Sequence, residues 1–150
     1  MNFPVGSVVG KGDVPFDFAS KAMELAQSSF NGYIILTVKG HFIEEGVVFF
    51  REGEIVSCIV ECLALEQTLK GDKAMDFFLN ATKGVGFFHC VMLTRSQIDL
   101  INAFDEKLLL SNKIDLKDLP RMIPSAFSPK FYKVSTERSA LEAYGLGELM

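Results

Sequence analysis

Two cysteines, Cys58 and Cys62, have a C-x3-C spacing that could contribute to a metal site completed by His41 or His89. A zinc ion would need both sulfurs at about 2.3 Å. The residues around Cys58 are typical of a strand, and four residues of strand span roughly 13 Å, which is too far for one ion unless a local helix or turn intervenes. We therefore expect no metal and no cofactor. We expect Cys58, Cys62 and Cys90 to be reduced thiols in the core.

Three other groups of residues resemble catalytic or nucleotide-binding motifs without matching them. Glu44 and Glu45 could form a carboxylate pair, but neighbours on an extended chain point to opposite faces, so we interpret them as solvated loop charges. The glycines from Gly6 to Gly12 lack the spacing and the Ser or Thr of a phosphate-binding loop. His89 has no Ser, Cys or Asp placed to work with it. We expect the protein not to be an enzyme.

The composition favours a cytoplasmic protein with an apolar interior. The chain has 150 residues, of which 49% are hydrophobic, and contains 14 Phe but no Trp. A mean hydropathy of +0.25 is high for a chain of this size, so some apolar surface should remain after folding. The net charge of −4 disfavours nucleic acid as a partner. No apolar run reaches the roughly 20 residues of a transmembrane segment, and no signal peptide is evident.

The elements that would position these residues are organised around Gly46 to Ala81. Two apolar runs, Val47–Phe50 and Ile55–Val60, are joined by a three-residue connection that ends at Gly53, which predicts a hairpin. A helix capped by Asp72 follows, with apolar residues at i, i+3, i+4 and i+7. That spacing predicts one buried helix face, which we expect to lie on the hairpin.

Local signals predict further elements on both sides of this unit. They are a helix from Asp13 to about Ser28, a strand over Tyr33–Val38, a strand over Phe87–Leu93 and a helix opened by the capping box Thr94–Gln97. Leu63–Lys70 fits either a helical turn or a continued strand. We predict an α+β fold in which an antiparallel sheet of at least four strands packs helices on one face.

The domain organisation changes near Ser111. Residues 1–112 are expected to form one domain with a flexible or loosely docked lead-in over 1–14, and 113–150 a C-terminal extension punctuated by prolines. Apolar residues between Leu116 and Tyr132 require burial, so we expect this tail to wrap irregularly on the uncovered face or an edge of the sheet, or on a second copy. Ser135 or Thr136 could cap a last short helix.

Several motifs together resemble a known family. They are Phe30–Ile34, Val47–Val56, Gly71–Ala74 and Gly84–Phe88. In this order they resemble PatA amino-terminal (PATAN) domains, and more closely an archaeal family of unknown function in which a strand ending in Leu-Thr leads to a helix, as in Met92–Ile98. The resemblance covers roughly residues 15–110 and implies a non-catalytic protein interaction module near signalling proteins. It implies no functional residues.

Two functions follow as hypotheses. The first is a non-catalytic protein–protein interaction module with an unknown protein partner or a second copy, forming a homodimer. The alternative is binding of a small apolar ligand or lipid in a cavity lined by Phe side chains, against which a packed aromatic core must be weighed. The candidate interaction or ligand surface comprises Phe77, Phe78, Phe87, Phe88, Phe127, Phe131 and Tyr132.

Overall fold

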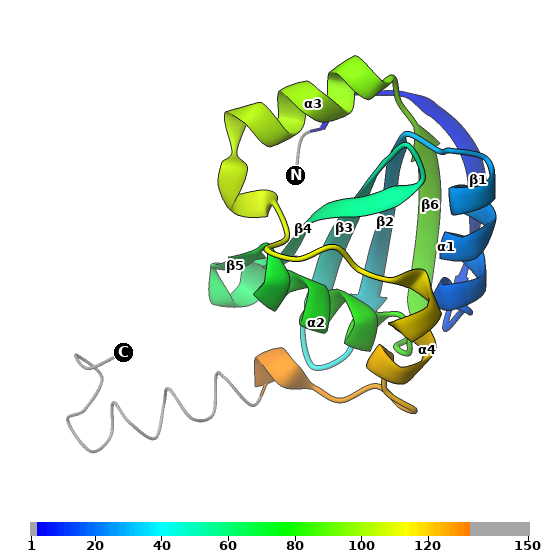
Figure 1. The fold of residues 1–150 in the computed structure, drawn as a ribbon. Helices are drawn as coiled ribbons and strands as arrows, with labels where there is room; N and C mark the ends of the chain where they lie inside the picture. Colours follow the sequence, from blue (N-terminus) through cyan, green and yellow to red (C-terminus); the bar gives the residue numbers. More distant parts are fainter. Residues whose placement is uncertain (1–2, 133–150) are drawn as a thin grey trace.

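A six-stranded antiparallel sheet forms the centre of the protein (Figure 1). The computed structural model describes residues 3–132. The strands lie in the order β1-β6-β2-β3-β4-β5, and all neighbouring pairs are antiparallel. Their bounds are β1 Ser7–Val14, β2 Gly32–Lys39, β3 Ile43–Arg51, β4 Glu54–Cys62, β5 Gln67–Lys70 and β6 Gly86–Met92. The predicted α+β class is confirmed, and the sheet has two strands more than the minimum expected.

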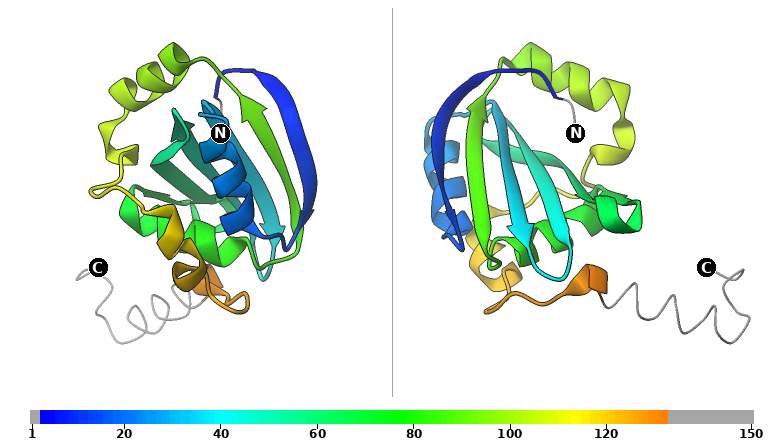
Figure 2. Two further views of the ribbon diagram at one scale, coloured as in Figure 1. Left: turned by 45° about the vertical axis from the view of Figure 1, so that its right-hand side comes forward. Right: turned by 180° about the vertical axis from the view of Figure 1, so that it is seen from behind.

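Helices lie on both faces of this sheet. On one face, α1 (Phe18–Gln27) and α2 (Asp72–Ala81) share a large apolar core with the strands. On the other face, α3 (Arg95–Phe104) buries Ile98 in a second, smaller core with β2, β3 and β6. The view from behind in Figure 2 shows α3 at one end of this face. The helix predicted from the capping box at Thr94 is α3, and it lies on the second face, whereas all helices were expected on one face.

The remaining helical segments of residues 3–132 are short. They are α4 (Leu119–Met122) and the 3-10 turns Leu63–Leu65, Glu106–Leu108 and Leu116–Asp118. The sequence of Leu63–Lys70 fitted either a helical turn or a strand, and the structure contains both. The 3-10 turn Leu63–Leu65 comes first, and β5 follows it. Every helix in the described part of the chain falls short of the length and apolar character needed to cross a bilayer.

The β3–β4 hairpin has a tighter turn than the sequence predicts. Arg51 and Glu54 are paired, so the connection contains two residues, Glu52 and Gly53, with φ angles of 50° and 81°. Two successive positive φ angles are typical of a type I′ turn, whose twist matches that of the strands. A Cβ atom on Gly53 would lie 2.9 Å from the backbone of Ala26 in α1, so glycine also allows this turn to reach α1.

The expectation of a flexible or loosely docked lead-in over residues 1–14 is wrong for residues 7–14, which form β1 and pair with β6. The sequence pattern is weak because glycine disfavours strands and because an edge strand exposes many of its side chains. A bulge between Val8 and Gly10 interrupts the register further. Packing explains why position 12 is a glycine, because a Cβ atom there would lie 2.9 Å from the Phe88 ring.

Two predicted helix caps are displaced, and a third is confirmed. Asp17, not Asp13, caps α1 by accepting a hydrogen bond from the Ser20 amide at 3.0 Å. Gly71 occupies the cap position of α2, and the Asp72 carboxylate instead accepts from the Ser111 amide at 3.0 Å. The capping box predicted at Thr94 is present and opens α3.

Residues 113–132 form a segment, here called the strap, that crosses the helical layer. It contains α4 and runs past α1 and α2 (Figures 1 and 2). Leu119 and Phe131 are fully buried in the larger core, although the tail was expected on the uncovered face or an edge of the sheet. The helices α1 and α2 have ten residues each and do not cover the whole apolar face of the sheet, and the strap covers the remaining part. The helix predicted after Ser135 or Thr136 lies outside the described residues.

Candidate functional site

The strap is attached to α2 by a pair of polar contacts. Asn80, whose side chain is 1% exposed, donates from Nδ2 to the Ser128 carbonyl at 2.8 Å. The Ser128 amide donates back to Asn80 Oδ1 at 2.9 Å. One buried amide side chain thus satisfies both backbone groups of a strap residue, as a neighbouring strand would. The contact fixes the position of the strap along α2.

Aromatic contacts continue this attachment toward Tyr132. The rings of Phe77 and Phe131 lie 4.7 Å apart in an edge-to-face arrangement, and Phe131 is fully buried. The Lys130 ammonium lies 5.2 Å from the centroid of the Phe77 ring, which is within cation–π range. Tyr132 stacks on His41 at 4.1 Å. The last described residues of the strap are therefore anchored to both α2 and the β2–β3 connection.

Glu44 lies buried beside this attachment. It belongs to β3, is 3% exposed, and its Oε1 atom has no hydrogen-bond partner within residues 3–132. Desolvation raises its pKa from 4.5 to about 7, and the positive charge of Lys130 opposes that rise. The interpretation of Glu44 as a solvated loop charge is wrong, because β3 begins one residue before it and turns its side chain toward the helical layer.

A carboxyl group with this pKa could exchange protons near neutral pH, as acid–base catalysis requires. The position of Glu44 works against that use, since almost none of the side chain is accessible to a substrate. Its charge contributes to raising the pKa of the nearby Cys62 thiol, although burial is the larger cause. The group therefore resembles a buried carboxyl retained in the core more than an accessible base.

The three cysteines are buried thiols, as expected. Burial raises the pKa of Cys90 to about 11 and that of Cys58 further still. Thiols with such pKa values are protonated at neutral pH and are poor nucleophiles. Cys58 and Cys62 both lie in β4, and no group of three or more metal-ligating side chains occurs in the described range.

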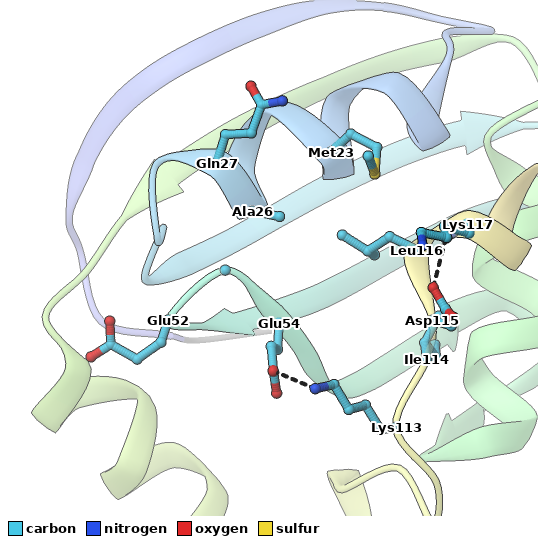
Figure 3. A pocket seen from close by; sticks show the side chains of 11 residues that line it. Met23, Ala26, Gln27, Glu52, Glu54, Lys113, Ile114, Asp115, Leu116 and Lys117 are labelled. Atoms are coloured by element: carbon cyan, nitrogen blue, oxygen red, sulfur yellow. Dashed lines mark hydrogen bonds and ion pairs between the residues drawn. The ribbon is translucent and has the colours of Figure 1, made fainter.

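A surface pocket of about 740 Å³ lies where α1, the β3–β4 turn and the strap meet (Figure 3). Met23 and Ala26 of α1 and Leu116 of the strap provide its apolar lining. The ion pair between Lys113 and Glu54, at 2.7 Å, joins the strap to β4 beside it. The volume falls within the range of small-molecule sites. Sequence reasoning missed this pocket because three segments distant in the chain form it.

The predicted Phe surface is divided between different parts of the molecule. Phe77 and Phe131 pack together, Phe78 contacts Phe18 of α1, and Phe88 stacks on Phe16. Phe127 is half-buried against the same core. Phe87, by contrast, is half-exposed and lies beside His89. Tyr132 contacts His41, as described above. Most of these rings thus fill the interior against one another.

The edge strand β1 exposes apolar side chains and one side of its backbone. β1 ends the sheet, so its outer backbone faces no further strand within residues 3–132. Val8 and Val9 are 59% and 52% exposed, and Met92, which is paired with Ser7, is about half-exposed. At the other side of the sheet, β5 pairs with only part of β4, and residues after α3 contact the rest of that strand. Leu109 forms a β-bridge with Ser57, and the Leu110 amide donates to the Val56 carbonyl. The part of β4 that β5 does not pair with is therefore covered, and β5, with four residues, is a shorter edge than β1.

Fold and site together define an α+β domain in which an antiparallel sheet lies under two helices and a C-terminal strap. The chain belongs to the family described as "Uncharacterized protein conserved in archaea (DUF2226)", whose model matches residues 1–104. This confirms the resemblance to an archaeal family of unknown function. No curated protein and no solved structure matches the chain.

Proposed function

We propose that this chain is a non-catalytic, cytoplasmic protein interaction module that binds its partner along the edge strand β1. The observation that carries the proposal is the open edge itself. β1 has eight residues, and alternate ones direct their backbone groups to the outer side, where no further strand lies within residues 3–132. An exposed strand edge accepts an additional strand through main-chain hydrogen bonds. The exposed Val8 and Val9 side chains would supply apolar contact to such a strand.

The distribution of reactive groups supports a binding role over a catalytic one. Glu44 and the three cysteines, which could in principle carry chemistry, are enclosed in the core. The resemblance to PATAN domains adds support, because those domains are regarded as interaction modules near signalling and regulatory proteins.

A site-specific photo-crosslinker at Val9 tests this proposal in extract of the source cells. We expect crosslinking to a protein at Val9 but not at Met122, a strap residue with similar exposure that lies away from β1. Equal crosslinking at both positions, or none at Val9, would contradict the proposal. A circular dichroism spectrum of each labelled chain shows whether the label has disturbed the fold.

A second candidate function is binding of a small apolar ligand, and the pocket beside α1 favours it. The Phe side chains first considered for such a cavity pack against one another, so Met23 and Leu116 are the better candidates for contact. Native mass spectrometry of the purified chain should then show an adduct that Leu116→Glu removes. A spectrum with the chain mass alone would count against this function.

A further inference from the structure

The solvent-facing charges of β1 have an arrangement that is complementary to itself. Lys11 and Asp13 are paired with His89 and Phe87 of β6, so both project from the same face of the sheet, one on either side of Gly12. Both are exposed, and neither takes part in an ion pair within residues 3–132. Two unpaired charges of opposite sign therefore lie two residues apart on an open edge.

A two-fold axis through Gly12 would pair these charges between two copies. In an antiparallel pair of identical strands centred on Gly12, each residue before the centre lies opposite the residue at the same distance after it. Lys11 of one copy would then lie opposite Asp13 of the other, and this contact would occur twice. Directly opposed residues of antiparallel strands have Cβ atoms about 5 Å apart, which is within reach of an ion pair.

The opposite face of the same segment offers little steric hindrance. Gly10 and Gly12 have no side chains, and Val14 is buried against the core of its own chain. The Lys21 ammonium lies 3.6 Å from the position of a Cβ atom on Gly10, so the flexible end of this side chain of α1 reaches the strand on this face. A second strand could approach without displacing a bulky side chain of β1 on this face.

From this geometry we infer that the partner of β1 is a second copy of the same chain, joined as an antiparallel β1–β1 pair with its two-fold axis at Gly12. This inference rests on the proposed function and names its partner. The pattern specifies a copy of the chain because the charges complement their own sequence in reverse direction. The bulge between Val8 and Gly10 limits the regular joint to the residues near Gly12.

The short joint and the exposed charges predict the character of this dimer. Few residues pair, so association should be reversible and should increase with protein concentration. Exposed charge pairs are screened by dissolved ions, so added salt should weaken the dimer. The bulge and Lys11 would also hinder strands of unrelated sequence, because both features protect sheet edges against nonspecific pairing.

Charge reversal provides the test, with light scattering after gel filtration of the full chain as the measurement. The single variants K11D and D13K place like charges opposite each other, and each should raise the dimer dissociation constant by at least about tenfold. An equimolar mixture of the two single variants should form a heterodimer, because the mixed pair restores both attractions. The double variant K11D/D13K should dimerise like the natural chain.

Several results would overturn the inference. They are a natural chain that stays monomeric at all concentrations, single variants that dimerise unchanged, and a mixture that stays monomeric. Unchanged thermal unfolding of the variants rules out misfolding as the reason for a monomer. If the natural chain is monomeric while Val9 crosslinks to a different protein, only this inference fails. If Val9 also crosslinks to nothing, the proposed function fails with it.

Discussion

Replacing Glu44 with glutamine should remove a pH dependence from the stability of the protein. The pKa of this carboxyl is about 7 in the folded chain and 4.5 when solvated. Between those values the folded state holds a proton that the unfolded state has released, so stability falls as the pH rises. The contribution is fully present below pH 4.5 and is lost as the pH passes about 7.

The magnitude follows from the two pKa values. They differ by about 2.5, and each pKa unit corresponds to 1.36 kcal/mol, so Glu44 should lower the free energy of unfolding by about 3 kcal/mol between acidic and mildly alkaline pH. Lys130 is the charged group that opposes the shift, and the adjacent Cys62 thiol stays protonated over this range because its pKa is raised. Glutamine keeps the size of the side chain but has no proton to lose.

Urea unfolding of Glu44→Gln and the natural chain at about pH 5 and about pH 8 measures this contribution. The natural chain should lose about 2.5 kcal/mol more than the variant between the two conditions, because part of the contribution is already lost at pH 5. Contributions from groups other than Glu44 are common to both proteins and cancel in the comparison. Glu106→Gln, at an exposed position, is the matched control and should behave like the natural chain. Equal pH dependence in Glu44→Gln and the natural chain would show that Glu44 is solvated and would refute this reasoning.

Four further predictions concern the strap and the hairpin turn. Phe131→Ala should lower the free energy of unfolding by about 3–5 kcal/mol, measured by urea unfolding, because it empties a fully buried site; a loss below about 1 kcal/mol would mean that the strap is not docked. Asn80→Ala should cost about 2–3 kcal/mol in the same assay, since it leaves the backbone groups of Ser128 unpaired, and an unchanged stability would contradict that contact. Gly53→Ala should lower the melting temperature because φ is +81° there and α1 lies close, and an unchanged value would show that the turn can move. A chain ending at Ser111 should melt lower or change its oligomeric state; an unchanged melting temperature and mass by light scattering would make the strap a mere linker.

The elements that could be predicted from sequence are those with local causes. The capping box at Thr94 depends on contacts within four residues, and the β3–β4 hairpin on two apolar runs around one glycine. Such signals are contained in the sequence window that forms the element. The strand β1 could not be recognised, because its partner β6 follows more than 70 residues later. In addition, a glycine such as Gly12 is needed for a contact with a distant side chain, the Phe88 ring, which the local sequence does not reveal.

The candidate sites depended on contacts that a sequence window does not contain. A glutamate beside a turn is normally solvated, but Glu44 is buried, and Lys130 of the strap, from the other end of the described chain, is the charge that acts on it. The apolar composition of the strap did predict that it must dock. The sequence did not indicate where the strap docks, because the hydrogen bonds between Asn80 and Ser128 join two residues that belong to no recognisable sequence pattern.

The position of β6 between β1 and β2 also affects how the protein is made. The meander of β2, β3 and β4 joins neighbours in the chain and needs only short loops to close, whereas β1 cannot enter the sheet until β6 is in place. During synthesis β1 therefore leaves the ribosome before the other strands. Its partner within the chain, β6, is complete only after residue 92 has been synthesised. We expect pulsed hydrogen exchange to protect β3 before β1, and protection of β1 first would contradict this order. During that interval the segment with Lys11 and Asp13 is available to a neighbouring nascent chain on the same messenger RNA.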